Sequence, residues 1–294
     1  MREKDEHYTE SNGKTLSNEN CHETEQRSPR TISLRGILRI VLLLIGTVFV
    51  ALTILVAVTE LPEPNLPAAL VDFIANQSLN PHPAPLPSST DWVLLSYEEI
   101  PDTLKEAVVA VEDKRFYSHR GIELISIIRA LVANLRAGEI VEGGSTITQQ
   151  LAKNLFLTQE RTLDRKFKEA VYSLKLEMCC SKEEILEMYI NVIYFGHGTY
   201  GCEMASRCYF GKSAKDLDLA EAALLAGIIK GPEIYSPYHN LELAEQSKAL
   251  VLDLMVQQGY INPHVAEQAK TEPVKIVGRP ESNLFIIPIN GWRA

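Results

Sequence analysis

The sequence has few basic residues and few cysteines for its length. It holds 29 Lys and Arg against 38 Asp and Glu among 294 residues, and its formal net charge is −9. A protein whose main partner is a nucleic acid needs a basic face for the phosphates, so this balance argues against nucleic acid as a partner. The remaining composition, 46% hydrophobic and 23% charged, is that of an ordinary folded protein.

The scarcity of cysteine excludes a disulfide scaffold and a standard zinc site. The chain contains five cysteines, at Cys21, Cys179, Cys180, Cys202 and Cys208. Two adjacent cysteines and a Cys-x5-Cys pair match no common zinc spacing. Because disulfide pairing does not follow from sequence, buried thiols and one structural bridge both remain open.

One long uncharged run, residues 40–59, predicts a transmembrane helix. Its 20 residues suffice to cross a hydrocarbon core. A signal-peptide core is usually shorter and ends at a small-residue cleavage site, which this run lacks. Arg27, Arg30, Arg35 and Arg39 lie close before the run with no acidic residue among them, and Lys105 is the next Lys or Arg after it. The positive-inside rule therefore places residues 1–39 in the cytoplasm and the rest of the chain outside, away from nucleotide cofactors.

Composition divides the rest of the chain. Residues 1–39 form a polar, largely disordered tail, and residues 60–90 form a stiff spacer with seven prolines. A short helix at the membrane surface over 71–75 is an alternative within the spacer. A folded domain is expected at 91–275, followed by a tail at 276–294.

Within the domain, apolar residues recur at helical spacing from Ile122 to Leu135, and Gly138 is placed to end that helix. Ser181 and Glu184 have the spacing of a capping box and predict the start of another helix. Strand-like runs are few, so the domain is predicted to be mainly α.

A first motif places acids beside aromatic residues and a histidine. Glu112 and Asp113 are followed by Phe116, Tyr117 and His119. A carboxyl group against aromatic surface can have a raised pKa and act as a general acid or base near neutral pH. A solvated Glu at a helix end is the alternative, and Asp113 fits either a cap of the next turn or a partner for an Arg.

A second motif begins at Gly143-Gly144, which permits a tight turn. Ser145 is expected to cap the helix that follows. Thr146, Gln150 and Lys153 have the spacing that puts them on one face of this helix. A helix N-terminus with hydroxyl groups and a Lys suits a diphosphate or a sugar. The alternative is an exposed polar face with a good cap.

A third motif pairs Arg165 with Glu169, four residues apart on one helix face. A surface pair of this kind contributes roughly 0.2–0.5 kcal/mol to helix stability. The functional interpretation is a second carboxylate held by an Arg, with Lys166 nearby to receive phosphate charge.

These motifs resemble the signature blocks of the peptidoglycan glycosyltransferases of the penicillin-binding proteins. Five blocks occur in order between Trp92 and Ile261, the last two being Ile185 to Asn191 and Arg207 to Lys212. The resemblance implies a mainly α, lysozyme-like, two-lobed glycosyltransferase domain. The chain ends at Ala294 without the Ser-x-x-Lys and Lys-Thr-Gly motifs of a following transpeptidase domain, so the monofunctional branch is expected.

The resemblance also implies a reaction and roles for the residues. Glu112 would be the general base that deprotonates the acceptor hydroxyl of lipid II, and undecaprenyl diphosphate would leave with inversion. Glu169 would assist near the diphosphate, directly or through Mg²⁺ or Mn²⁺. The implied substrate-binding residues are Asp113, Phe116, His119, Gly144, Ser145, Thr146, Gln150, Lys153, Asn154, Arg165 and Lys166.

The partners implied are lipid II, the growing glycan strand, membrane lipid and other cell-wall synthesis or division proteins. The expected location is the bacterial inner membrane, with the catalytic domain in the periplasm. Two other functions stay open: a glycan hydrolase on the same fold, and an inactive scaffold that binds lipid II. The Lys153, Arg165 and Lys166 cluster argues against the hydrolase, and the intact Glu112 and Glu169 argue against the scaffold.

Overall fold

A computed structural model describes residues 34–79, 92–139, 141, 143–158, 160 and 162–277. The polar tail up to residue 33, the second half of the proline-rich spacer and the end of the C-terminal tail lie outside these residues. The chain divides into two compact units, Met1–Ala51 and Leu52–Ala294.

The predicted membrane segment, residues 40–59, lies within helix α1 (Leu34–Glu60). Among the described residues, no helix has both the length and the apolar character needed to cross a membrane. The transmembrane helix is therefore not confirmed.

Within the predicted spacer, residues 66–79 form helix α2 (Leu66–Leu79), which is longer than the short helix considered at 71–75. The side chain of Asn65 accepts a hydrogen bond from the backbone N–H of Ala68, and Pro67 stands in the first helical turn, where a missing N–H costs nothing. Phe73 is buried and packs edge-on against Trp92 and Tyr200. This segment is thus part of the folded unit, because its apolar face has a partner that local sequence does not reveal.

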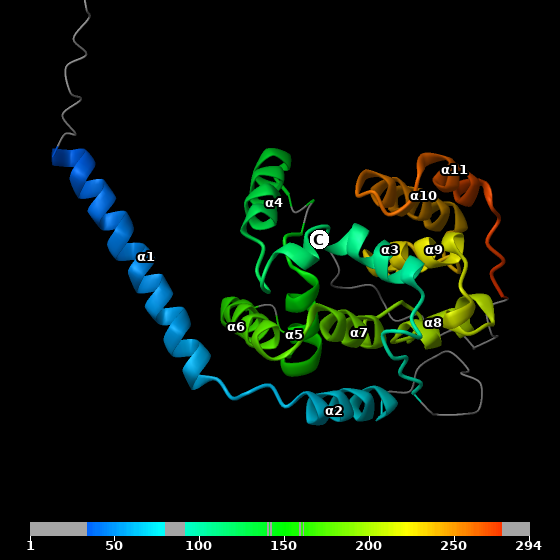
Figure 1. The fold of residues 1–294 in the computed structure, drawn as a ribbon, viewed down its shortest axis with the longest axis horizontal. Coiled ribbons are helices and arrows are strands. Elements are labelled where there is room, and N and C mark those ends of the chain that lie inside the picture. Colours follow the sequence, from blue (N-terminus) through cyan, green and yellow to red (C-terminus); the bar gives the residue numbers. More distant parts are fainter. Residues whose placement is uncertain are drawn as a thin grey trace, which may run out of the picture. The chain divides into compact units, whose positions relative to one another are not determined.

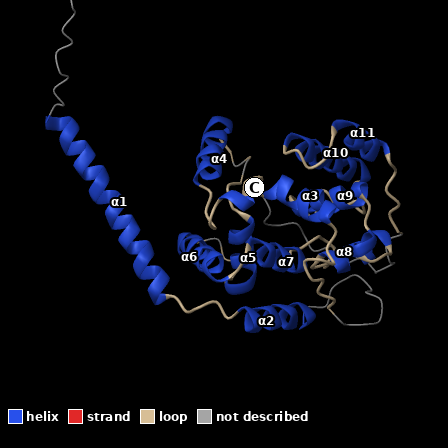
Figure 2. Cartoon of the chain, in the orientation of Figure 1, coloured by secondary structure: helices blue, strands red, loops and turns tan. Residues whose placement is uncertain are grey.

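The unit that contains the motifs is mainly α, as predicted (Figures 1 and 2). The extended runs at 92–95 and 274–277 belong to no sheet among the described residues, where the β pairs are isolated bridges. Its elements are α3 (Asp102–Glu112), η1 (Phe116–Ser118), α4 (Leu124–Ala137), α5 (Ile147–Phe156), α6 (Leu163–Cys179), α7 (Lys182–Val192), α8 (Cys202–Phe210), η2 (Ala214–Asp216), α9 (Leu219–Ile229), α10 (Leu241–Gln257) and α11 (Pro263–Thr271).

Two groups of helices position the site. In one group α9 packs against α3 and α10, and in the other α5 packs against α6, α7 and α2. Helix α9 is apolar around its circumference and buried from Ala220 to Ile229, as expected for a helix enclosed by others. Its N-terminus is closed by a capping box between Asp218 and Glu221.

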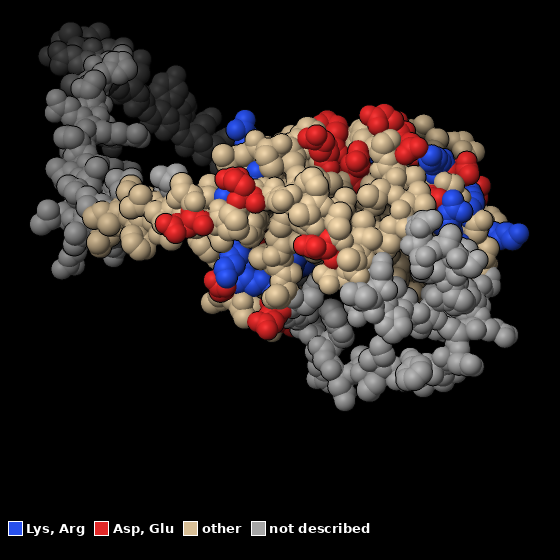
Figure 3. All heavy atoms as spheres, turned by 90° about the horizontal axis from the view of Figure 1, so that it is seen from below, with Lys and Arg blue, Asp and Glu red and all other residues tan. Residues whose placement is uncertain are grey.

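Helix α4 turns a row of apolar side chains outward. It ends at Gly138, which has a left-handed backbone with φ of 73°, as predicted from the sequence. The solvent-exposed fraction is 68% for Leu124, 61% for Ile128 and 73% for Leu135. This surface contrasts with the face drawn in Figure 3, where charged side chains of both signs are interspersed among uncharged ones.

Candidate active site

Glu112 stands at the C-terminal end of α3 and is fixed by a residue of α5. Gln150 Nε2 donates a hydrogen bond of 2.7 Å to Glu112 Oε2. Gln150 Oε1 in turn accepts a 3.1 Å hydrogen bond from the hydroxyl of Tyr189 on α7, which fixes the orientation of the amide. The carboxylate is therefore held by a chain of contacts from three helices.

The pKa of Glu112 is raised, as the motif predicted. Burial of the carboxyl group is the main cause, and the hydrogen bond from Gln150 opposes it. The positive charges of Lys230 and Lys153 also oppose the rise, whereas the charge of Asp113 adds to it. A carboxyl group with a raised pKa, still stabilised by a donor and two cations, suits a general base near neutral pH.

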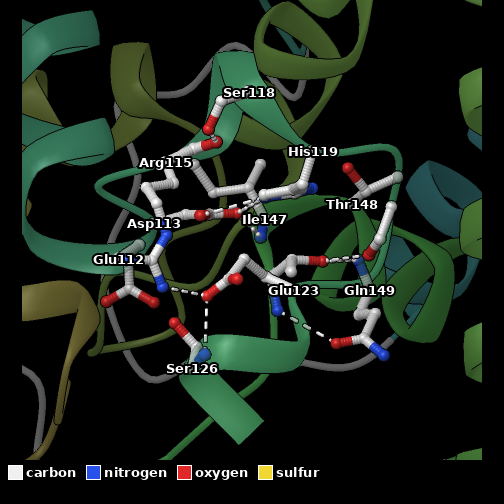
Figure 4. Close-up of polar contacts among 12 residues, drawn as sticks. Glu112, Asp113, Arg115, Ser118, His119, Glu123, Ser126, Ile147, Thr148 and Gln149 are labelled. Carbon is white, nitrogen blue, oxygen red and sulfur yellow. Dashed lines mark hydrogen bonds and ion pairs between the residues drawn. The ribbon is translucent and has the colours of Figure 1, made fainter. Parts of the chain in front are cut away.

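Asp113 joins the first motif to the second. Its buried carboxylate accepts hydrogen bonds from His119 Nε2 at 2.9 Å and from the backbone N–H of Ile147 at 3.2 Å (Figure 4). Ile147 is the first residue of α5, so Asp113 caps a helix that lies 34 residues further along the chain. The sequence left two roles open for Asp113, a cap of the next turn and a partner for an Arg. The carboxylate is a cap, but it caps the distant helix α5 and not the turn that follows Asp113 in sequence. Arg115 pairs instead with Glu123, the N-cap residue of α4.

Phe116 and His119 support this arrangement from the interior. Phe116 is fully buried and packs edge-on against Tyr117 and His119, with Lys182 Nζ 4.3 Å from the centre of its ring. Nδ1 of His119 is buried and has no hydrogen-bond partner within the described part of the chain. Both residues were predicted to bind substrate. In the structure His119 contacts Asp113, and Phe116 packs against His119.

The cap predicted for α5 is wrong by one residue. Thr146 is the N-cap, and it forms a capping box with Gln149, whose backbone N–H lies 3.1 Å from Thr146 Oγ1. A capping box needs a Glu or Gln three residues after the N-cap residue. Thr146 has Gln149 at that position, whereas Ser145 would have Thr148. The Thr146 hydroxyl also donates to the carbonyl of Gly121 at 2.6 Å. Ser145 is left free of the helix and accepts a 2.8 Å hydrogen bond from Lys166 Nζ.

Gly144 brings the start of α5 close to α4. A Cβ atom at this position would lie 3.1 Å from Cα of Ile127 and 3.2 Å from the carbonyl oxygen of Ser126. Only glycine fits this approach without displacing backbone, which accounts for one of the two glycines before the helix.

A cluster of cations surrounds Glu169 on α6. Arg165 Nη1 lies 3.1 Å from Glu169 Oε2, and Lys166 pairs with Oε1 of the same carboxylate, so the predicted pairing is confirmed. The Glu169 side chain is nearly fully buried. Three cations, counting Lys153, against one carboxylate leave the cluster with a net positive charge.

Lys153 is the cation of this cluster for which the described part of the chain offers no partner. Burial lowers the pKa of its amine, and the charge of Glu169 opposes that shift. Among the described residues its side chain makes no hydrogen bond or ion pair. A partly buried, unpaired ammonium group that feels both Glu112 and Glu169 is suited to an anionic ligand.

Two residues of the site were missed in the sequence. Lys230 directly follows α9, far from the α5 motif in sequence, and its positive charge lowers the pKa of Glu112. No role was assigned to it from the sequence. Tyr189 belongs to the block from Ile185 to Asn191; its side chain is buried, and its hydroxyl reaches Gln150. No local pattern distinguishes either residue from a structural one.

Asn154 does not join the group around Glu112. It lines a separate cavity of about 290 Å³ together with residues 155–158, which follow it in the chain, and with Asp72, Phe73 and Asn76 of α2. Adjacent residues of an α-helix point about 100° apart, so Asn154 points in a different direction from Lys153.

A divalent cation near Glu169 was expected from the resemblance. No three His, Cys, Asp or Glu side chains come together to hold a metal ion in the described residues. Both oxygens of Glu169 are already engaged by Arg165 and Lys166. These residues do not fit a protein-held cation, and we route no chemical step through one.

Comparison with known proteins bears on the same region. Penicillin-binding protein 1A of Aquifex aeolicus is 50% identical over 182 residues, which is 62% of this chain and 25% of the relative. Penicillin-binding protein 1F of Bacillus subtilis is 48% identical over 184 residues, 63% of this chain and 25% of the relative. The chain thus spans about a quarter of the length of these relatives.

Among solved structures, the crystal structure of penicillin-binding protein 1A from Haemophilus influenzae has 22% identity and a TM-score of 0.38, over 63% of this chain and 18% of that chain. That likeness is too weak to add to the description of the fold. The sequence signature of the family described as Transglycosylase matches residues 84–256. The match covers more than half of the chain and includes Glu112, the start of α5 and Glu169, and the chain therefore belongs to the transglycosylase family.

Proposed function

We propose that this protein is a peptidoglycan glycosyltransferase that polymerises lipid II into linear glycan strands. The observation that carries the proposal is the environment of Glu112. Its carboxyl group has a raised pKa, is held by Gln150, and feels the positive charges of Lys153 and Lys230. Family membership supports the same reaction class.

In the reaction, the carboxylate of Glu112 takes the proton from the 4-hydroxyl of the GlcNAc unit of the acceptor. The oxygen then attacks the anomeric carbon of the MurNAc unit of the donor. The bond between that carbon and the diphosphate oxygen breaks, and undecaprenyl diphosphate leaves with inversion at the carbon. A base of raised pKa makes the first proton transfer more favourable at neutral pH.

The leaving diphosphate requires positive charge where its negative charge develops. Lys153 meets this requirement because it has no partner within the described residues. Arg165 and Lys166 add charge, and their pairing with Glu169 holds them on one face of α6. Glu169 therefore acts by positioning the two cations. Ser145 and Thr146 lie at the N-terminus of α5, where Ser145 contacts Lys166.

A glycan hydrolase with Glu112 as general acid is the competing function. A hydrolase that cleaves between sugars releases no diphosphate and has no need of an unpaired cation beside its acid. Lys153, which is partly buried and has no partner among the described residues, therefore favours the transferase. An inactive scaffold would have no need of the contacts that orient the carboxylate of Glu112.

We further propose that the domain works at the outer surface of the bacterial inner membrane, anchored by residues 40–59 with the N-terminus in the cytoplasm. The outward apolar side chains of α4 support a contact with lipid, since an apolar patch of this size is otherwise a liability in water. Lipid II and the growing glycan strand would be the substrates, other cell-wall synthesis or division proteins would be partners, and the fold would be lysozyme-like and two-lobed.

The experiment that tests the proposal is incubation of the purified full chain in detergent with labelled lipid II, with the products resolved on a gel. High-mass polymer is the expected result. Shortening of pre-made glycan strands without polymer would replace the transferase by the hydrolase. If the protein binds lipid II but is inactive on both substrates, the result would favour the inactive scaffold.

A further inference from the structure

Two adjacent cysteines at the end of α6 have no part in the proposed reaction. Cys179 is the last residue of α6 and Cys180 is its C-cap. Their sulfur atoms lie 3.4 Å apart, and both thiols are free. Cys179 is exposed, whereas Cys180 is partly buried and packs against the hydrophobic core.

The surroundings leave the two sulfur atoms available to each other. The other contact of Cys179 Sγ is a long one, 3.6 Å to the carbonyl oxygen of Leu176. The backbone N–H of Cys180 donates to the same carbonyl at 2.9 Å and holds the turn in place. A sulfur-mediated hydrogen bond is weak, so it does not keep the two sulfur atoms from approaching bonding distance.

The other described cysteines do not share this geometry. Cys202 is fully buried, and Cys208 lies 3.8 Å from the hydroxyl of Tyr238 rather than near a second thiol. Burial raises the pKa of the Cys180 thiol and of the Cys202 thiol to about 12, so Cys180 differs from Cys202 in its contact with a second sulfur atom and not in its acidity. Both cysteines therefore serve as internal references for the reactivity of the adjacent pair.

We propose that Cys179 and Cys180 form a redox-active dithiol, which a low-molecular-weight disulfide converts reversibly into a disulfide between neighbouring residues. The exposed thiolate of Cys179 attacks one sulfur of the oxidant, which forms a mixed disulfide and releases one thiol. Cys180 then loses its proton and attacks Cys179 Sγ, which releases the second thiol. In sum, two protein thiols and one oxidant disulfide give one protein disulfide and two small thiols.

The product is expected to be easily reduced. Neighbouring Cα atoms are about 3.8 Å apart across a trans peptide, which is shorter than the separation of about 4.4–6.8 Å in ordinary disulfides. The resulting strain raises the reduction potential, so the pair should exchange with glutathione instead of staying locked as a structural bridge. The site is thus one for reversible modification by thiols and disulfides.

The test uses the purified full chain, treated with oxidised glutathione, alkylated with iodoacetamide and digested with trypsin. Cleavage after Lys175 and Lys182 yields one peptide, residues 176–182, that holds both cysteines and no others. The expected peptide is lighter than the dithiol form by two hydrogens and carries no alkyl group. Prior treatment with reduced glutathione in excess should restore two alkylation sites. Peptides with Cys202 and Cys208 should be unchanged.

Two variants separate the steps. In Cys180→Ser, the attacking second thiol is absent, so glutathione should remain attached to Cys179. In Cys179→Ser, the exposed thiol is absent, so Cys180 should react much more slowly than Cys179 does in the first variant. The proposal is overturned if wild-type Cys179 keeps a stable glutathione adduct, if both cysteines remain alkylatable after oxidation, or if either one bridges to a distant cysteine. None of these outcomes bears on lipid II polymerisation.

Discussion

The amide of Gln150 donates to Glu112 across 38 positions of sequence, and this contact joins the helix-start motif of α5 to the acid at the end of α3. The hydroxyl of Tyr189 holds the other end of the amide. The contact lowers the pKa of Glu112, while burial raises it. The position and the proton affinity of the proposed base thus depend on the same side chain.

Gln150→Leu should raise the pKa of Glu112 further, because it removes a donor that stabilises the carboxylate. The base works when it is deprotonated, so the acidic limb of the pH profile of kcat/KM should move to higher pH. A hydrogen bond to a charged group is worth roughly 1.5–3 kcal/mol, which predicts a shift of about one pH unit or more. Tyr189→Phe, which keeps the amide, should shift the limb less. A rate that falls equally at every pH would contradict this role.

Asp113→Ala should destabilise the domain, because it leaves buried donors of Ile147 and His119 without their acceptor. An unsatisfied buried donor costs about 1–3 kcal/mol, so a clear drop in the denaturation midpoint is expected in urea. Asp164→Ala removes an exposed carboxylate of α6 and is the matched control, with a midpoint close to that of the wild type. Equal midpoints for the two variants would show that Asp113 does not anchor α5.

Lys153→Ala should weaken binding of the diphosphate donor while leaving stability nearly unchanged, because the ammonium group has no partner in the described residues. Loss of a charged hydrogen bond of roughly 1.5–3 kcal/mol predicts a 10- to 100-fold rise in KM for lipid II. Lys168→Ala, which removes an exposed lysine of α6 paired with Asp164, is the control. Identical kinetics for both variants would remove Lys153 from the site.

Leu131→Glu should impair use of membrane-embedded substrate, because Leu131 is 56% exposed on the apolar surface of α4. The rate on lipid II in vesicles should fall several-fold, and the rate on a short-chain, water-soluble analogue should not change. Leu250→Glu, at a 44% exposed position of α10, is the control. An equal fall on both substrates would mean that α4 acts on the reaction and not on the membrane contact.

Local features of the fold were predictable from sequence because they depend on neighbours in the chain. Gly138 ends α4, and the capping box of Ser181 and Glu184 starts α7, as expected. The pairing of Arg165 with Glu169 also follows from helical spacing. Such features require no knowledge of the tertiary structure.

The features that failed depend on contacts between distant segments. Asp113 reaches the start of α5, and Lys230 acts on Glu112 from another helix. The proline-rich stretch became α2 because Phe73 finds Trp92 and Tyr200. The one-residue error at Ser145 is different, since Gln149 three residues after Thr146 was visible in the sequence and identified the correct cap.

The folding of a Glu112→Gln variant can be separated from its activity. The folded pKa of Glu112 is above its unfolded value, so the folded state holds the proton more tightly. The contribution of this group to stability is present at low pH and is lost as pH rises through the folded pKa. The Gln side chain does not ionise, so the variant avoids the free-energy cost of a buried carboxylate. It should therefore be at least as stable as the wild type at neutral pH.

The most direct test of the account is polymerisation of labelled lipid II by the Glu112→Gln variant beside the wild type and Glu106→Gln, a control on the same helix. Loss of a general base costs about 10²–10⁴-fold in rate. The account predicts high-mass polymer from the wild type and the control, and a fall of at least 100-fold in Glu112→Gln with an unfolding midpoint no lower than that of the wild type. Substantial polymer from a folded Glu112→Gln variant would contradict the assignment of Glu112 as the base.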